Sequence, residues 1–514
     1  MDTVDAAVIG SGPNGLVAAA LLARAGWKVA VFERNAVAGG AVASAPLTLP
    51  GYTHDPYSAF YGILHSSPVF SELGLDRRVD WARFAVPVAA AASPEAVALI
   101  HADLSRTAEG LAARAGADGP AWLDLYAWWE KLGTKFFSMM LSPVGSLRRA
   151  VPVGLAARHY GLFETAQMQL APIDAIARER FADEASRALL AAGATHSDVA
   201  VDMPGSGPAA LILALAAQQV NMPVPVGGAG RLAEALAAVV TEAGGVIHTG
   251  AEVTRVVVER NRAKGVESKA GEVRVKHAVV ADTGPGALFS SLAPGADLPA
   301  RYLAGLKRFR YGTGVFKVDV AVDGEVGWRA DGLAECGVVH LTGSLDDMAR
   351  AAFEARHGVV PTKPALIVGQ QSAADPSRAP EGCRTLWIET HVPGTPVEDG
   401  SWEKAKDRFC DIVLDRVEEH APGLRGRVAG LHVRTPDELA GENPNLVGGD
   451  LGAGSGSIDQ QLVFRPVPGW FRYSTPVEGL YLCSASTHPG GGVHGMGGRN
   501  CAKRVLSDRR RRRI

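Results

Sequence analysis

The feature that most constrains the fold is a glycine pattern close to the start of the chain. Gly10, Gly12 and Gly15 form G-x-G-x-x-G directly after the apolar run 6–9, and an alanine- and leucine-rich stretch follows over 16–25. The pattern predicts a buried strand, a tight turn and a helix. Strand, glycine turn and helix in this order indicate a doubly wound α/β fold that binds a dinucleotide.

A second apolar strand is expected over 29–32, and Glu33 follows it directly. In such a fold the glycines allow the turn, the approach of a pyrophosphate and close helix packing, and the helix N-terminus attracts the phosphates. An acid at the tip of the second strand accepts hydrogen bonds from ribose hydroxyl groups. Because the tip holds an acid and not an arginine, NAD or FAD is favoured over NADP. The expected contacts also include three neighbouring residues, Pro13, Asn14 and Arg34.

A second glycine-rich stretch, HPGGGVHGMGGRN over 488–500, lies near the other end of the chain. It follows the apolar run 480–483, so a strand, a glycine loop and a helix that begins near Met496 are expected. A helix N-terminus with unobstructed N–H groups stabilises negative charge. The glycines are therefore expected to leave room for a ligand beside these donors.

Together these segments resemble the FAD-dependent amine oxidase and phytoene desaturase superfamily. The N-terminal match extends from AAVIGSGPNG to a glycine pair at 39–40, and THPGGGVHG resembles the C-terminal flavin motif of the carotenoid desaturases. The resemblance spans nearly the whole chain. It is closest to a phytoene-dehydrogenase-related branch named after a pyridine nucleotide-disulfide oxidoreductase domain, of which the segment 370–393 is typical. It implies FAD as the cofactor.

The resemblance also implies further cofactor contacts. Gly39 and Gly40 would let the backbone pass close to the phosphates and the ribityl chain, although Ala41 stands where many members have arginine. Val253, in AEVTRV, would touch the adenine through its backbone. In the C-terminal motif, backbone N–H groups would stabilise the negative charge of reduced flavin. The residues assigned to this motif are Ala485, Val493, His494 and Gly495, with His488 and His494 expected to order the loop.

The resulting fold class is α/β, with a Rossmann-type FAD-binding domain built from discontinuous segments and an inserted α+β substrate domain. The segments 1–75, 225–300 and 446–508 are assigned to the FAD-binding domain. The segments 76–224 and 301–445 are assigned to the substrate domain, and 509–514 to a disordered basic tail.

One residue of the second domain is a candidate for catalysis. GVFKVDVAVDG, over 314–324, predicts a strand, and Lys317 stands near its start. In amine oxidases a lysine in a similar place holds a water near flavin N5, and the resemblance implies this role for Lys317. The alternative, a surface lysine at the end of a strand, stays open. Neither G-x-S-x-G nor H-E-x-x-H occurs, so no hydrolase elbow and no metal site are expected.

Val493 occupies the place where amine oxidases would have an aromatic cage residue, which disfavours amine oxidation. The expected function is that of an FAD-dependent oxidoreductase acting on a hydrophobic, unsaturated, carotenoid- or retinoid-like small molecule. A hydride would pass to or from flavin N5. A flavin amine oxidase and a non-catalytic FAD-binding regulatory protein are the alternatives.

Composition bears on compartment and partners. The five cysteines include no C-x-x-C pair, so disulfide chemistry is not expected, and the net charge of -2 gives no reason to expect nucleic acid. No signal peptide is expected, which favours the cytoplasm. The electron acceptor and the oligomeric state stay open. One cluster of large apolar residues allows two interpretations. The first is core packing, and the second is a lipophilic tunnel or a membrane-facing surface. The cluster consists of Trp122, Trp128, Trp129, Phe136, Phe137, Met139 and Met140.

Overall fold

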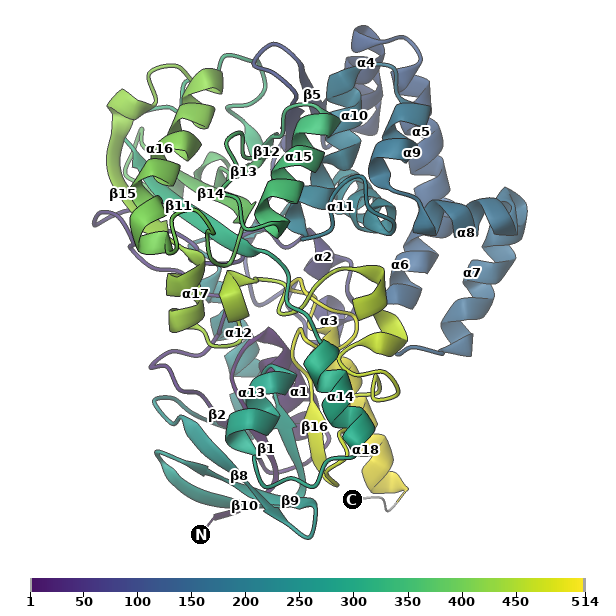
Figure 1. Ribbon diagram of the computed structural model, residues 1–514, viewed down its shortest axis with the longest axis vertical. Coiled ribbons are helices and arrows are strands. Elements are labelled where there is room, and N and C mark those ends of the chain that lie inside the picture. Colours follow the sequence, from purple (N-terminus) through teal and green to yellow (C-terminus); the bar gives the residue numbers. More distant parts are fainter. Residues whose placement is uncertain (1, 512–514) are drawn as a thin grey trace.

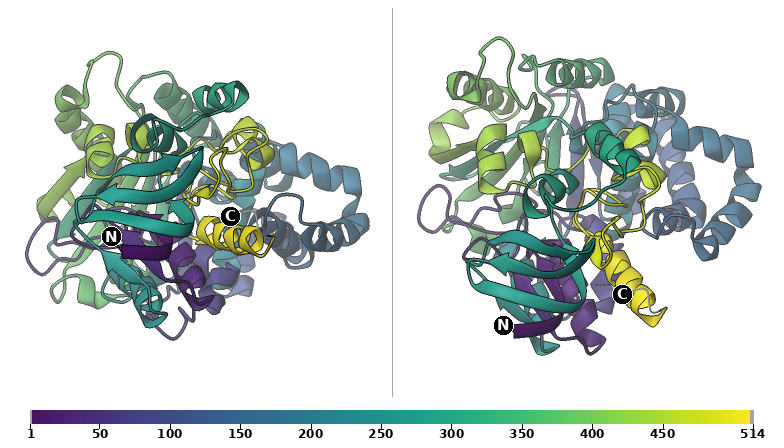
Figure 2. Two further views of the ribbon diagram at one scale, coloured as in Figure 1. Left: turned by 90° about the horizontal axis from the view of Figure 1, so that it is seen from below. Right: turned by 60° about the horizontal axis from the view of Figure 1, so that its bottom comes forward.

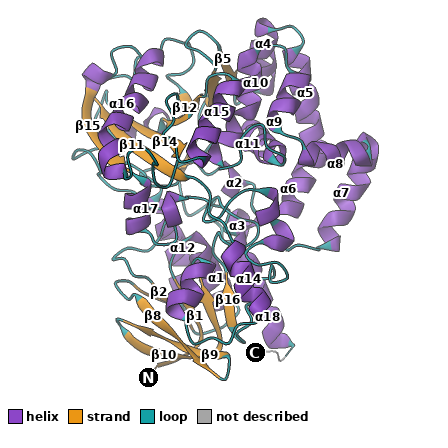
Figure 3. Cartoon of the chain, viewed as in Figure 1, coloured by secondary structure: helices purple, strands orange, loops and turns teal. Residues whose placement is uncertain are grey.

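Two large β-sheets organise the protein, one at the lower end of Figure 1 and one at its upper left. The computed structural model describes residues 2–511. Both labelled chain ends lie beside the lower sheet (Figure 1). Figure 3 shows that helices without strands fill the upper right of the molecule.

The first sheet has seven strands in the order β7-β2-β1-β10-β9-β8, with β16 paired to β10. Strands β7, β2, β1, β10 and β16 run parallel, and β8 and β9 form an antiparallel meander with β10. Three distant parts of the chain therefore build one sheet, as the discontinuous arrangement predicts. The strands are β1 (Asp2–Ile9), β2 (Val29–Phe32), β7 (Val246–His248), β8 (Val253–Glu259), β9 (Arg262–Ser268), β10 (Gly271–Ala281) and β16 (Leu480–Leu482).

Three helices pack on this sheet: α1 (Pro13–Arg24), α12 (Gly230–Glu242) and α18 (Met496–Arg510). α1 consists almost entirely of buried small and apolar residues, which lets α12 and α18 both lie against it. The predicted start of α18 at Met496 is confirmed.

The basic tail predicted for 509–514 begins later than expected, because its first residues belong to a helix. α18 continues through Arg510, and its last turns are held because Asp508 accepts a hydrogen bond from the Tyr481 hydroxyl at 3.0 Å and Val505 is buried. Residues 509 and 510 are thus helical, and 512–514 lie outside the described residues.

The second sheet also has seven strands, in the order β15-β11-β14-β13-β12-β4-β5. Its neighbours are antiparallel except for the pair β4 and β12. One face packs on the long helix α16 (Trp402–His420), where Phe316 of β11 meets Trp402 and Phe409. The strands are β4 (Val86–Ala91), β5 (Val97–Ile100), β11 (Gly314–Val322), β12 (Cys336–Leu341), β13 (Leu366–Gly369), β14 (Arg384–Val392) and β15 (Val428–Arg434).

The helical part lies between residues 104 and 220. Trp122, Trp129 and Phe137 are buried, which confirms the core interpretation for these three, whereas Trp128, Phe136, Met139 and Met140 are only partly buried. Trp129 begins a π-helical turn that joins α5 to α6. The helices are α4 (Leu104–Arg114), α5 (Asp118–Trp128), α6 (Thr134–Met140), α7 (Leu147–Tyr160), α8 (Leu162–Leu170), α9 (Ile173–Arg180), α10 (Glu184–Ala191) and α11 (Ser206–Val220).

Shorter elements connect these parts. Among residues 2–511, no helix combines the length and the apolar character needed to cross a bilayer. The remaining elements are β3 (Trp81–Ala82), β6 (Val224–Pro225), α2 (Gly62–His65), α3 (Pro68–Glu72), α13 (Pro285–Ala287), α14 (Ala300–Arg308), α15 (Leu345–Arg356) and α17 (Pro436–Glu442).

Candidate cofactor site

The N-terminal glycine turn lies where β1 meets α1, and other parts of the chain lie close against each of its three glycines. Gly10 has φ of +89°, a conformation that favours glycine. A Cβ at Gly15 would lie 2.4 Å from the carbonyl oxygen of Gly10. α1 begins with Pro13, which has no N–H to leave unpaired.

Asp282, at the end of β10, is the partner of this turn that sequence reasoning missed. Its Oδ2 accepts a hydrogen bond from the Gly15 N–H at 2.9 Å and so caps α1 from a distant part of the chain. A Cβ at Gly12 would lie 2.7 Å from the same Oδ2. Burial raises the pKa of Asp282 to about 7. The hydrogen bond from the Gly15 N–H lowers this pKa, and the negative charge of Glu33 raises it.

Glu33 stands at the end of β2, beside the glycine turn. Its Oε2 accepts hydrogen bonds from the Ser11 N–H at 3.0 Å and the Ser11 hydroxyl at 2.7 Å, and Oε1 accepts from the Asn35 N–H at 2.9 Å. The Glu33 carbonyl accepts from the Ala251 N–H at 2.7 Å, which brings the start of β8 at Val253 to the same edge. Arg34, in contrast, is exposed.

The glycine pair lies directly against the glycine turn. The Gly39 N–H donates to the Ser11 carbonyl at 3.1 Å, and a Cβ at Gly40 would lie 2.9 Å from the Gly12 Cα. Gly39 has φ of +134°. The structure therefore brings together the two N-terminal glycine patterns that the sequence analysis treated as one site.

The C-terminal motif places the start of α18 beside the start of α1. A Cβ at Gly498 would lie 2.0 Å from the Asn14 carbonyl oxygen, and the Gly498 N–H donates to Asn14 Oδ1 at 3.2 Å. A Cβ at Gly497 would lie 2.5 Å from the Cys483 carbonyl oxygen. The expectation that the glycines leave room for a ligand is therefore wrong for these two, which allow contact between protein segments. Two helix N-termini nevertheless converge here, which favours an anion.

The two histidines of the motif hold it in place. Nδ1 of His494 accepts a hydrogen bond from the Met496 N–H at 3.0 Å at the start of α18, and Nε2 of His488 lies 2.9 Å from the Ser142 carbonyl oxygen. Burial lowers the pKa of His494 to about 4 and lowers that of His488 as well. Both rings are therefore neutral at pH 7. Nε2 of His494 is buried without a partner among the described residues.

Arg465 is a second residue that sequence reasoning missed. Its buried guanidinium donates to the carbonyl of Ala485 at 2.8 Å and to carbonyls of the loop 452–455, including Ser455 at 3.0 Å. Within residues 2–511 no carboxylate forms a salt bridge with it, although Asp450 and Asp198 lie close enough to influence its pKa. Burial lowers that pKa to about 10, so the group keeps its charge at neutral pH.

Lys317 lies away from these glycines, on the second sheet. Its side chain is fully buried, so the alternative of a surface lysine is wrong. Nζ contacts Asp319 Oδ1 at 2.5 Å and lies 5.0 Å from the centre of the Trp387 ring. Asp319 also pairs with Arg434 at 3.0 Å across β11 and β15. Burial lowers the pKa of Lys317, Arg434 acts in the same direction, and Asp319 opposes both.

Glu389 faces Lys317 across the pair β11 and β14. Burial raises the pKa of Glu389 to about 8, and Asp319 adds to the rise while Lys317 and Arg434 oppose it. Its Oε1 has no hydrogen-bond partner among the described residues. The inner face of this sheet thus holds several ionisable groups close together and out of water.

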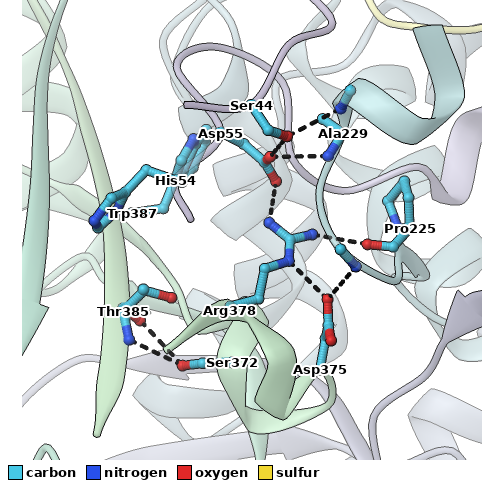
Figure 4. Close-up of polar contacts among 12 residues, drawn as sticks. Ser44, His54, Asp55, Pro225, Ala229, Ser372, Asp375, Arg378, Thr385 and Trp387 are labelled. Carbon is cyan, nitrogen blue, oxygen red and sulfur yellow. Dashed lines mark hydrogen bonds and ion pairs between the residues drawn. The ribbon is translucent and has the colours of Figure 1, made fainter. Parts of the chain in front are cut away.

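A buried ion-pair cluster joins the second sheet to the start of α12 (Figure 4). Arg378 lies between Asp55 at 2.7 Å and Asp375 at 2.8 Å. Asp55 also accepts from the Ala229 N–H at 2.9 Å, and Asp375 from the Gly227 N–H at 2.8 Å. The cluster fixes the glycine-rich turn before α12 relative to the segment 375–378.

Comparison with known proteins decides the family. The family described as "Flavin containing amine oxidoreductase" matches residues 14–382, well over half of the chain. The chain belongs to the flavin-containing amine oxidoreductases. As a member of this family it is an FAD-dependent oxidoreductase, and the prediction of FAD as cofactor is confirmed at this level.

Two of three similar proteins align with nearly the whole length of the chain, and the third aligns with about half of it. The pyridine nucleotide-disulfide oxidoreductase domain-containing protein 2 of Rattus norvegicus is 29% identical over 98% of this chain and 93% of its own length. One of the subunits of limonene dehydrogenase from Castellaniella defragrans is 24% identical over 98% and 94%. A phytoene desaturase (neurosporene-forming) of Cereibacter sphaeroides is 27% identical over 53% and 51%.

Solved structures show the same fold. An oxidoreductase from Methanosarcina mazei has a TM-score of 0.64 at 18% identity and covers 99% of this chain and 100% of its own. A putrescine oxidase variant has a TM-score of 0.59 at 16% identity, with coverage of 98% and 99%. The predicted fold class is confirmed. All five cysteines lie within the described residues 2–511 and are free thiols in the structure.

Proposed function

We propose that this flavoenzyme oxidises or reduces carbon–carbon bonds of a hydrophobic, unsaturated small molecule. The observation that carries the proposal is the electrostatic character of the C-terminal motif. Both histidines of the motif are neutral at pH 7, and the charged side chain that bonds to Ala485, just before the glycine loop, is the cation Arg465. A protonated amine would find no attraction in the neutral histidines or in Arg465, and a hydrocarbon needs none.

The cofactor would be held along the edge where the two helix N-termini meet. In this proposal the pyrophosphate is held by the turn Gly10–Gly15 and by the pair Gly39–Gly40. Glu33 binds the ribose, and the backbone of Val253 contacts the adenine. Bound FAD supplies a hydride acceptor or donor at its N5. The N–H groups around Val493–Gly495, together with Arg465, would favour negative charge on the reduced ring.

The relatives support an apolar substrate. Two of them are named for limonene and phytoene, and both molecules are unsaturated hydrocarbons. Amine oxidation is the alternative within the family, and Lys317 is its candidate residue. Because Nζ of Lys317 gives one of its three N–H groups to Asp319, two remain to hold a water.

Anaerobic reduction of the bound flavin tests this proposal. Holoprotein is mixed without oxygen with limonene or phytoene in detergent micelles, or with putrescine, and the visible flavin band is followed. Chemically reduced holoprotein is mixed with the same hydrocarbons, to cover the reverse direction. We expect bleaching or recovery of the band with a hydrocarbon and none with putrescine. Bleaching by putrescine alone would assign amine oxidation instead.

A further inference from the structure

Two helices, α7 and α8, expose an unusual amount of apolar surface. They project from the body of the protein at the right of Figure 1, and both views of Figure 2 show the same projection. Gly161, with φ of +83°, turns the chain between them. Six apolar residues each keep between 51% and 88% of their surface exposed: Leu147, Val151, Leu155, Leu162, Phe163 and Leu170.

These residues form stripes and are not scattered. Leu147, Val151 and Leu155 follow one another at a spacing of four and therefore share one face of α7. Each helix already has a buried side, since Ala157 of α7 and Thr165 of α8 are buried and α8 packs on α11. The exposed stripes are thus a second apolar side that the described residues do not cover.

The charge of the hairpin differs from that of the chain. Residues 147–170 hold three arginines, Arg148, Arg149 and Arg158, against the single acid Glu164, whereas the whole chain has a formal charge of -2. Arg158 continues the apolar stripe three residues after Leu155. Basic residues beside exposed apolar ones are typical of helices that lie in the interface of a membrane.

The hairpin is connected directly to the candidate flavin site. The loop between α6 and α7 contributes the carbonyl of Leu141, which accepts from Asn500 Nδ2 at 3.0 Å, and the carbonyl of Ser142, which contacts His488. α7 begins a few residues later, at Leu147. The segment that leads into the hairpin therefore contacts the C-terminal motif of the proposed site.

We propose that the hairpin α7–α8 rests on the surface of a bilayer that carries anionic lipid head groups. The arginines would meet the head groups while the leucines and Phe163 enter the boundary with the acyl chains. A second copy of the chain fits less well, because a symmetric contact would bring the arginines of both copies together. The inference extends the proposed function and rests on it for the nature of the substrate delivered there.

The test is sedimentation of the holoprotein with vesicles of phosphatidylcholine, with or without phosphatidylglycerol. We expect at least about tenfold stronger partition into the anionic vesicles, and a loss of this preference in Arg148→Glu/Arg149→Glu. Leu155→Asp/Phe163→Asp should weaken binding to anionic vesicles by at least about tenfold. The control is Phe353→Asp, which changes a phenylalanine on α15 that is 54% exposed and lies outside the hairpin, and this variant should bind as the wild type does.

Circular dichroism and FAD content establish that each variant is folded. Wild-type protein that stays in solution with anionic vesicles, or a Leu155→Asp/Phe163→Asp protein that binds as well as the wild type, would overturn the inference. A wild-type dimer in light scattering that this variant makes monomeric would assign the surface to a second copy. Vesicle binding needs no turnover, so failure of the membrane inference and failure of the proposed substrate class are separate results.

Discussion

The two sheets of this protein bury polar groups in different ways. At the edge of the first sheet, carboxylates and a ring nitrogen are met by main-chain N–H groups: Glu33 by Ser11 and Asn35, Asp282 by Gly15, and His494 by Met496. On the second sheet, the side chains Lys317, Asp319 and Arg434 meet one another. Main-chain donors at helix N-termini also attract anionic ligands, whereas a set of buried ion pairs acts as a scaffold.

The difference predicts where substitutions affect stability and where they affect the cofactor. Removal of one member of a buried ion network leaves an uncompensated charge, which is expensive. Substitutions around the first sheet alter the backbone beside the proposed FAD site or the charge near it. They should therefore change FAD binding more than substitutions on the second sheet do.

The largest effect is expected for Asp319→Ala. The change leaves Lys317 and Arg434 buried without their shared carboxylate, and we expect the free energy of unfolding to fall by about 3–5 kcal/mol. Denaturant unfolding measures this. The control Asp415→Ala removes an exposed partner of Arg425 and should cost about 0–1 kcal/mol. Equal losses in the two variants would contradict the buried network.

A smaller loss of stability is expected for Gly498→Ala. The new methyl group would meet the Asn14 backbone, so α18 must move away from α1, at a cost of about 1–3 kcal/mol and with loss of FAD. Gly110→Ala, in the exposed part of α4, meets nothing within 4 Å and should instead stabilise by about 0.5–1 kcal/mol. Thermal unfolding with and without FAD measures the change in stability and the loss of FAD binding separately in each variant. The contact between α1 and α18 would be in doubt if both variants melted alike.

Arg465→Met tests the electrostatic field without removing a backbone contact of the cofactor. Loss of the buried cation should weaken FAD binding by about tenfold, or about 1.4 kcal/mol, and should make the flavin harder to reduce. Fluorescence titration and a redox titration measure these quantities. Arg310→Met, which removes an exposed pair with Asp459, is the control. An unchanged reduction potential in Arg465→Met would rule out its effect on the ring.

A different kind of effect, a pH dependence of stability, is expected from Glu389. Because the folded protein raises its pKa to about 8, it binds this proton more tightly than the unfolded chain does. The resulting stabilisation is fully present below the ordinary pKa of a glutamate, near 4.3, and is lost as pH rises toward 8. Glu389→Gln should flatten this part of the stability curve. Unfolding midpoints between pH 5 and 9 show it, and an unchanged slope would mean that Glu389 ionises normally.

The sequence could predict the parts of the site that depend on local patterns. Gly10, Gly12, Gly15 and Glu33 follow one another within a single strand–helix–strand unit, where spacing alone fixes their positions. Asp282 was missed because its role comes from β10 lying parallel to β1 across more than 250 residues of sequence. A sign was present, since Asp282 directly follows the apolar run 278–281, as Glu33 follows 29–32.

Burial was harder to predict than pattern. Trp122, Trp129, Leu155 and Phe163 all lie in stretches with many apolar residues, yet the two tryptophans are buried while Leu155 and Phe163 are exposed. Trp122 and Trp129 donate hydrogen bonds to Gln218 and Gln219 of α11, and these partners lie far along the chain. Arg465 was likewise unpredictable, because its partners are main-chain carbonyls, which leave no pattern in the sequence.

The most direct test of the central claim is the FAD content of purified protein, measured from its visible spectrum and from the flavin released by heat. The claim is that FAD is held at the edge of the first sheet, by the glycine turn after β1 and by Glu33 after β2. We predict close to one FAD per wild-type chain and in Glu259→Ala, an exposed control, and strongly reduced content in folded Glu33→Ala. Full FAD content in Glu33→Ala, or colourless wild-type protein that takes up no added FAD, would contradict it.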